Sequence, residues 1–393
     1  MLRKIKDKVL SLPKDFIFFL IAISFFGFSQ SIVDSTFNNF LNETFKLSNF
    51  DRGFLELPRE LPGFLVIFVT ALLSFLCSRR LAALSHLIIA IGIFLIAVFS
   101  INLSVMLIWL FIYSIGQHIF LPLNQSIGME LAHEGQTGKR LGQISGATNI
   151  FAIVGSFVIF IGFNFLHFNF RISFIIASIG FVLTSLFIFL MTQSTPTPVK
   201  SKFSLRKEYG LFYWLCILFG TRKQIFLTFA PWVLVTVFHQ KTQVVATLLT
   251  IGGIIGIFFK PLLGKAIDKF GEKTILTAEA IILIFVCLGY GFARDIFSET
   301  VALIITFSCY ILDQLLMSVS MARATYLKKI AVDKSEISQT LTMGVSIDHI
   351  FSISIALISG LIWLKFGYQF VFLIGACIAF INMISTSQIK VKS

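Results

Sequence analysis

Long uncharged, apolar segments alternate with short polar segments along the whole chain. Ile88–Leu103, Phe174–Met191 and Phe370–Ile384 are three apolar centres that contain no charged residue. A helix of about 20 apolar residues is long enough to cross a hydrocarbon core of about 30 Å. Charged residues, glycine, proline and asparagine bound twelve such segments. We therefore predict membrane-spanning helices at 15–40, 53–77, 82–100, 104–131, 140–165, 172–192, 209–238, 243–264, 274–293, 299–327, 337–364 and 367–386.

The composition agrees with this pattern. Of the 393 residues, 56% are hydrophobic and only 13% are charged, about half the charged share of a soluble domain. The net charge of +13 would suggest nucleic-acid binding in a soluble protein. Here the basic residues lie in short loops, where they set membrane orientation and contact anionic lipid headgroups. We therefore expect membrane lipids as partners and no nucleic acid.

The basic residues also alternate from loop to loop. The two termini and the even-numbered loops hold 21 Lys and Arg, the odd-numbered loops hold six, and five lie inside spans. Basic loops remain on the cytoplasmic side. This distribution predicts a multi-pass protein of a bacterial inner membrane with both termini in the cytoplasm.

The two halves of the chain are weakly similar to each other. Tyr113–Gln117 in the fourth span matches Tyr310–Gln314 in the tenth, and other matches follow at offsets between 190 and 197 residues. Such an offset indicates duplication of a six-helix unit. We predict an all-α membrane protein with twelve transmembrane helices in two pseudo-symmetric six-helix bundles. The expected parts are an N-terminal bundle at 1–192, a cytoplasmic linker at 193–208 and a C-terminal bundle at 209–393.

The loop after the eighth span carries a recognisable motif, Gly264-Lys-Ala-Ile-Asp268-Lys269-Phe-Gly271-Glu-Lys273. It resembles the cytoplasmic loop motif of the major facilitator superfamily, Gly-x-x-x-Asp-Arg/Lys-x-Gly-x-Arg/Lys. Glycine permits a tight turn there, and the charged residues are expected to stabilise one conformation.

The first-half copy of this motif departs from the family pattern. The loop Ser78-Arg79-Arg80-Leu81 keeps the basic residues but lacks the Asp and both glycines. Two markers of drug/proton antiporters, in the fourth and fifth spans, are also missing. The resemblance implies two halves that rock about a central substrate site, lined by spans one, four, seven and ten.

Several polar residues fall at a similar depth near the middle of the membrane. Arg222 lies 15 residues after Lys207, and Asp313 lies 15 before Lys328, so both are about 22 Å from the cytoplasmic edge. Ionisable groups at this depth are costly and need a partner, a cavity or a role. The candidate substrate-binding residues are Arg222, Lys223, Gln117, His118, Asp313 and Gln314, with Arg222 or Lys223 as the anion-binding group. The alternative is that Arg222 and Asp313 form a structural pair.

A second group carries candidates for proton coupling or gating. Asp348 and His349 lie in the eleventh span, and histidine and buried carboxylates suit proton exchange. Near the outer face, Asp34 and Arg59 are expected at one level and predicted to form a salt bridge, as a gate or as a static interface pair. Glu56 and Glu60 share a helix face with Arg59 and are alternative proton carriers. Glu130, Lys260, Glu279 and Arg323 lie near span ends and are expected to pair or to reach the interface.

These observations lead to a functional hypothesis. We expect a secondary active transporter, coupled to protons or another ion, that moves a small polar or charged organic solute by alternating access. A multidrug or lipid-type exporter of the same fold is the alternative, and a membrane-embedded enzyme is a distant one. No nucleotide-binding, HExxH or GxSxG motif occurs, and the five cysteines have no metal-ligand spacing. We therefore expect no enzyme activity, cofactor or metal, and a monomer.

Overall fold

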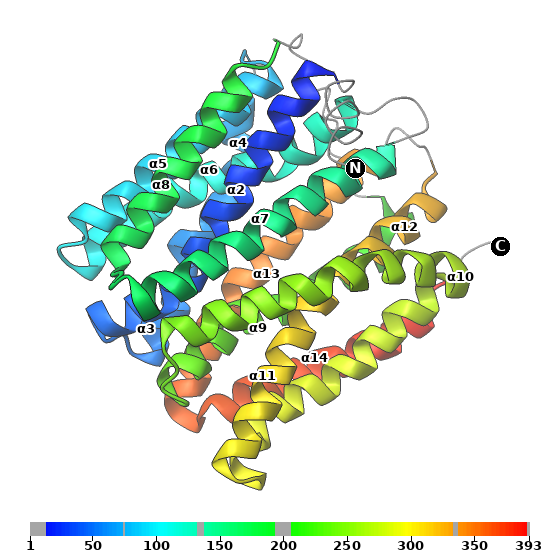
Figure 1. Cartoon of the computed structure of the whole chain (residues 1–393). Helices are drawn as coiled ribbons and strands as arrows, with labels where there is room; N and C mark the ends of the chain where they lie inside the picture. The colour runs from blue at the N-terminus through cyan, green and yellow to red at the C-terminus, as the bar shows by residue number, and fades with distance from the viewer. Residues whose placement is uncertain (1–12, 74, 132–136, 193–205, 333–336, 391–393) are drawn as a thin grey trace, which may run out of the picture. The chain divides into compact units, whose positions relative to one another are not determined.

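The computed structural model describes residues 13–73, 75–131, 137–192, 206–332 and 337–390. Over these residues the chain forms helices and no strands (Figure 1). Nine helices in the described part are long and apolar enough to cross a membrane. Helices are expected there because every backbone N–H and C=O must find its partner within the protein when lipid surrounds it. The prediction of an all-α membrane protein is confirmed.

Each of the twelve predicted spans coincides with a helix or with part of one. Spans eight and nine are the two parts of one long helix, and span ten is α11, η3 and α12 in succession. The helices are α2 (Lys14–Phe40), α3 (Asn49–Phe54), α4 (Glu56–Leu72), α5 (Ser78–Phe99), α6 (Leu103–Glu130), α7 (Thr137–Phe165), α8 (Phe170–Phe189), α9 (Gly210–Thr236), α10 (Thr242–Ile296), α11 (Glu299–Leu316), α12 (Ser320–Ile330), α13 (Ile337–Phe366) and α14 (Tyr368–Ser387), with short π or 3-10 turns at η1 (Leu41–Phe45), η2 (Lys207–Tyr209) and η3 (Met317–Val319).

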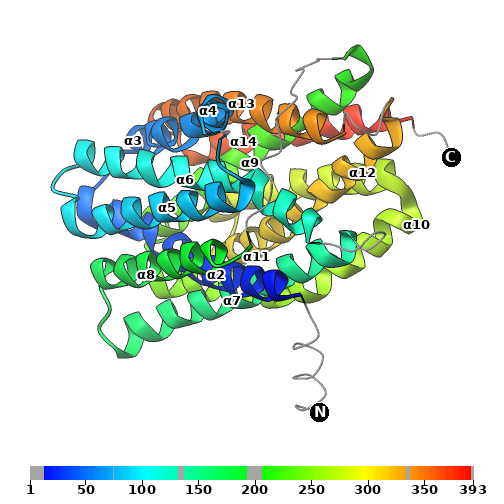
Figure 2. The same ribbon diagram turned by 90° about the horizontal axis from the view of Figure 1, so that it is seen from above.

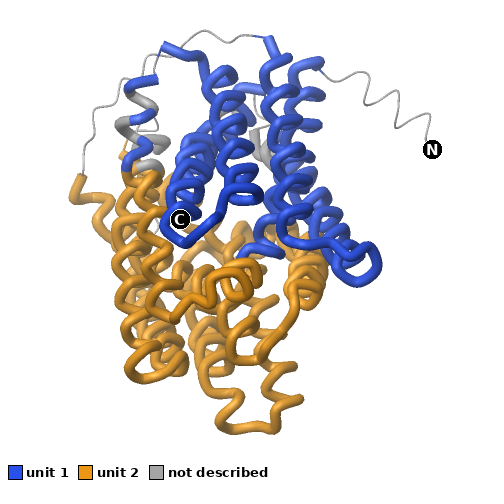
Figure 3. The backbone as a smooth tube through the Cα atoms, turned by 90° about the vertical axis from the view of Figure 1, so that its left-hand side faces the viewer, with its two compact units in different colours: residues 1–37, 65–199 blue, residues 38–64, 200–393 orange. Residues whose placement is uncertain are grey.

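The chain divides into two compact units, which Figure 3 colours separately. The first unit comprises residues 1–37 and 65–199. Within it α5 packs against both α6 and α8, and the three helices run side by side in Figures 1 and 2. Its core contains Phe16 and Phe19 of α2, Phe120 of α6 and Ile188 of α8. The apolar stripes of these helices are thus buried against one another.

The second unit comprises residues 38–64 and 200–393. Here α10 packs against α11 and α14, while α13 packs against α9 and the short helix α3. Residues 38–64 therefore belong by their contacts to the later part of the chain, although they precede α5. The predicted linker falls mainly on residues 193–205, outside the described residues, as do residues 1–12 and 391–393 of the two expected bundles. The boundaries 1–192, 193–208 and 209–393 stay a prediction.

The long helix α10 is interrupted at Gly271. This residue has φ 80° and ψ 161°, while the helix extends from Thr242 to Ile296. That conformation is essentially restricted to glycine, because a Cβ would collide with the backbone. The interruption separates predicted spans eight and nine, so the second glycine of the loop motif is where the turn occurs.

Candidate functional site

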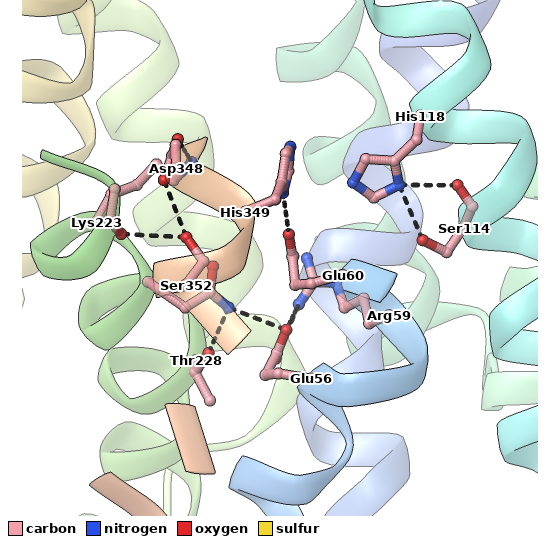
Figure 4. A network of polar contacts seen from close by, with 12 residues as sticks. Glu56, Arg59, Glu60, Ser114, His118, Lys223, Thr228, Asp348, His349 and Ser352 are labelled. Carbon is pink, nitrogen blue, oxygen red and sulfur yellow. Dashed lines mark hydrogen bonds and ion pairs between the residues drawn. The ribbon is translucent and has the colours of Figure 1, made fainter. Parts of the chain in front are cut away.

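Lys223 of α9 and Asp348 of α13 form an ion pair inside the second unit (Figure 4). Lys223 Nζ lies 2.9 Å from Asp348 Oδ2, and the Ser352 hydroxyl donates to Asp348 Oδ1 at 3.0 Å. The Lys223 side chain keeps 19% of its exposure and the Asp348 side chain 10%. A charged pair that retains some exposure can exchange its partner for a ligand with a smaller desolvation cost than a fully buried one.

Arg222, one residue earlier, is enclosed more completely. Its guanidinium donates to Asp313 of α11, and the two side chains are only 2% and 1% exposed. The structure therefore contains the Arg222–Asp313 pair that the sequence suggested as the alternative to a free anion-binding group. Gln314, the next residue on α11, is half-buried. The substrate-binding roles of Arg222, Asp313 and Gln314 stay predictions.

Glu56 is the centre of a buried hydrogen-bond network in residues 38–64. Its side chain is fully buried and accepts from Arg52 Nη1 at 2.6 Å and from Arg59 Nη1 at 3.2 Å. Gln224 Nε2 of α9 donates to the other carboxylate oxygen at 3.0 Å. Such charge-assisted bonds compensate the cost of burying a carboxylate. Glu56 thus joins the start of α4 to α9.

Glu60 lies one helical turn further along α4 and faces His349 of α13 (Figure 4). The Glu60 Oε2 to His349 Nδ1 distance is 2.8 Å, and both side chains are at most 10% exposed. Pro62 lies inside the same helix. Because the imidazole is charged only when protonated, the strength of this contact depends on the protonation of both partners.

In the first unit, Gln117 belongs to a different network. Its amide donates to Gln30 Oε1 at 2.7 Å and to the Tyr113 hydroxyl at 2.7 Å, and Gln30 Nε2 donates to Asp34 Oδ1 at 2.9 Å. His118, the next residue, contacts Ser114 Oγ through Nδ1 at 3.0 Å. Asp34 lies in the first unit and Arg59 in the second, so their predicted salt bridge stays a prediction.

Sequence reasoning missed several members of these networks, among them Gln30, Arg52, Gln224 and Ser352. Three of them lie four residues from a residue that the sequence pattern had indicated as a candidate. Gln30 bonds Asp34, Arg52 bonds Glu56, and Ser352 bonds Asp348. Positions i and i+4 are neighbours on a helix surface. A search for polar residues one turn from each intramembrane charge would therefore have identified these three.

Two buried acids of α10 lie close to basic residues. Glu279 faces Arg323 of α12 at 3.7 Å, and Glu272 contacts Lys329 at 2.9 Å. Both Glu279 and Arg323, which were expected to pair or to reach the interface, are buried in the second unit. In the loop motif, Gly264 is helical, while Asp268, Lys269 and Lys273 are exposed. A stabilising role for this loop stays a prediction.

Comparisons with known proteins agree on the fold. A family model described as Major Facilitator Superfamily matches residues 19–331. A D-xylose-proton symporter superposes with a TM-score of 0.72 at 16% identity, over 96% of this chain and 97% of that chain. A mutant of the nucleoside transporter NupG gives 0.74 at 16% identity, over 94% and 98%. The inward-open xylose transporter XylE from E. coli gives 0.70 at 14% identity, over 96% of each. No curated protein matches the sequence.

Proposed function

This chain belongs to the major facilitator superfamily, and we propose that it is a proton-coupled secondary transporter of a small polar or charged organic solute. The solute crosses a bacterial inner membrane by alternating access, in which the binding site opens to one side of the membrane at a time. Both chain termini lie in the cytoplasm, as the distribution of basic loops indicates.

The observation that carries this proposal is the position of residues 38–64. They follow most of the first span in sequence but pack within the second unit. Asn39 donates to the Gln240 carbonyl at 3.1 Å, and Trp232 Nε1 donates to Asn49 Oδ1 at 2.9 Å. Contacts between the two halves of the chain at one end are what alternating access requires, because that end must close while the other opens.

The packing of α3 on α13 is close enough to act as a gate. A Cβ at Gly53 would lie 2.5 Å from the Ala356 carbonyl oxygen and 3.2 Å from Gly360 Cα. The contact therefore depends on the absence of a Cβ at Gly53, which lets the backbones of α3 and α13 approach closely. We call residues 38–64 the gate segment.

The gate segment closes the outer end in this proposal. It bonds to Gln240, directly before α10 begins at Thr242, and the turn at Gly271 lies about 40 Å further along that helix. That turn belongs to a basic loop, which is expected in the cytoplasm. The contact with Gln240 is therefore assigned to the outer end of the second unit in this proposal.

Ionisable pairs on α13 support proton coupling. Glu60–His349 joins the gate segment to α13, and Lys223–Asp348 joins α9 to α13, one residue earlier. Protonation of either carboxylate removes the charge that holds its partner. A proton can thus loosen the contacts of α13 while the solute binds.

The kind of solute follows from the charged pair that keeps some exposure. Within the second unit, Lys223 and Asp348 offer one charge of each sign, and the Ser352 hydroxyl lies beside them. This pair suits a charged or zwitterionic solute better than an apolar drug or lipid. Two proteins of similar fold are named as a D-xylose-proton symporter and a nucleoside transporter, and xylose and nucleosides are polar solutes.

A two-stage experiment tests the proposal. Purified protein is screened by thermal shift against sugars, nucleosides, amino acids, organic acids and cationic drugs, and each stabilising compound is then assayed for uptake into proteoliposomes. We expect a polar hit whose uptake increases with an imposed proton gradient. Lys223→Gln should weaken binding at least tenfold, while Lys365→Gln, an exposed residue of α13, should not. Uptake that is unchanged after every ion gradient collapses would contradict coupling, and the absence of uptake for every bound compound would contradict the carrier role.

A further inference from the structure

A second group of charges lies inside the second unit, apart from the Glu60–His349 and Lys223–Asp348 pairs. Glu279 of α10 and Arg323 of α12 are 2% and 5% exposed. Arg222 and Asp313 also act electrostatically on Glu279. Two acids and two arginines thus share one interior region of α9, α10, α11 and α12. Buried charges are costly unless each is paired and hydrogen-bonded.

Glu279 is incompletely paired. Neither of its carboxylate oxygens has a hydrogen-bond partner among the described residues, and Arg323 Nη1 lies 3.7 Å from Oε2. That separation is longer than a hydrogen bond. Asp313 Oδ2 and Arg323 Nη2 are also without a partner in the described part of the chain. A buried carboxylate in this condition is stabilised by gaining a proton.

The neighbouring acid on the same helix shows the contrast. Glu272 is 3% exposed, yet Lys329 Nζ lies 2.9 Å from one of its oxygens and 3.0 Å from the other. Both carboxylate oxygens of Glu272 therefore lie within contact distance of the Lys329 ammonium group. Burial alone does not distinguish the two residues, whereas their hydrogen bonds do.

We propose that Glu279 is a proton-binding residue of this transporter, distinct from the acids of the gate segment. The proposal rests on the proposed function for its role in coupling. When the carboxylate takes up one proton from water, its negative charge is lost and the four-residue group changes from neutral to a net charge of about +1. Arg323 then loses its partner carboxylate while its guanidinium remains over the Phe219 ring, 3.5 Å from the centroid.

This proton therefore changes the charge balance at α12 and α9. Phe219 belongs to α9, four residues before Lys223, so Arg323 contacts the helix that carries the proposed solute-binding lysine. The ionisable groups acting on Glu279 are Arg323, Arg222 and Asp313. From α14, which also packs against α10, Thr386 bonds Thr277 and adds no charge there.

Infrared difference spectroscopy tests this assignment without a known substrate. Wild-type protein in proteoliposomes is moved from alkaline to acidic buffer, and the carbonyl stretching band of newly protonated carboxyl groups is recorded. We expect a band that is lost in Glu279→Gln and shifted in frequency in Glu279→Asp. Glu272→Gln, the matched buried acid on the same helix, should leave the band unchanged.

Two results would overturn the proposal: no protonation band in the wild type, or a band that persists unaltered in Glu279→Gln. If Glu279→Gln does not fold, the frequency shift in Glu279→Asp decides, and an unshifted band counts against the assignment. The readout is independent of transport. A lost band together with gradient-insensitive uptake would retain the proton site and reject the proposed coupling. Gradient-driven uptake with no Glu279 band would reject only this assignment.

Discussion

Glu60 Oε2 and His349 Nδ1 lie 2.8 Å apart in the second unit, although 289 residues separate them in the sequence. Their contact joins α4 to α13 through two titratable groups that are almost completely buried. A hydrogen bond that involves a charged group contributes about 1.5–3 kcal/mol. The contact is therefore strong enough to influence whether the gate segment is docked.

Replacing His349 by Gln should weaken docking of the gate segment. Gln retains hydrogen bonding but, unlike His, cannot gain a positive charge by taking up a proton. The labelling rate of a cysteine introduced at Leu47, which is 9% exposed, should increase about tenfold for each 1.4 kcal/mol lost. Lys365→Gln in the same helix is the control. Equal labelling in both variants would show that the Glu60 contact does not hold the gate segment.

Replacing Glu56 by Leu should destabilise the protein strongly. Arg52 has a fully buried side chain and donates to Glu56 at 2.6 Å, so the variant leaves a buried positive charge without its carboxylate. Breaking such a pair costs about 3–5 kcal/mol. Thermal unfolding in detergent measures the loss.

The double variant Arg52→Met with Glu56→Leu serves as the control for this prediction. It removes the buried guanidinium together with its carboxylate and should recover part of the lost stability, because only the weaker bonds from Arg59 and Gln224 to Glu56 remain lost. A double variant as unstable as Glu56→Leu alone would indicate that packing, and not the buried charge, determines the effect.

Replacing Gly53 by Ala should open the gate segment. The new Cβ would lie 2.5 Å from the Ala356 carbonyl oxygen, which forces α3 away from α13. Labelling of the Leu47 cysteine should again increase. Gly252→Ala on α10 is the matched control, since a Cβ there meets nothing within 4 Å, and it should be neutral or stabilising by about 0.5–1 kcal/mol. Unchanged labelling in Gly53→Ala would contradict the close packing of the gate segment.

Replacing Gly271 by Ala should lower the stability of the second unit by about 1–3 kcal/mol. Its φ of 80° is strained for any residue with a Cβ. Gly264→Ala tests the other motif glycine, which is helical and has open space around it, so we expect no loss there. Thermal unfolding of the two variants should separate them, and equal melting temperatures would mean that the turn at Gly271 can relax.

The helices could be predicted from the sequence, whereas the partners of the charges could not. Arg222 and Asp313 were placed at one depth by counting from Lys207 and Lys328, and they do meet. Asp348 lies 14 residues after Lys334 and so at a similar depth, yet it pairs with Lys223 and not with Arg222. Depth gives one coordinate, and the rotation of each helix about its axis decides which charges face each other.

Hydropathy and local hydrogen bonding determined the membrane-spanning helices from the sequence by itself, since each helix satisfies its own backbone within about 20 residues. Only the tertiary structure decided that Glu60 meets His349, that Gln224 reaches Glu56, and that Glu279 is left without a hydrogen bond among the described residues. These contacts join residues far apart in the chain, and they depend on how helices pack, which no local pattern of polar and apolar residues specifies.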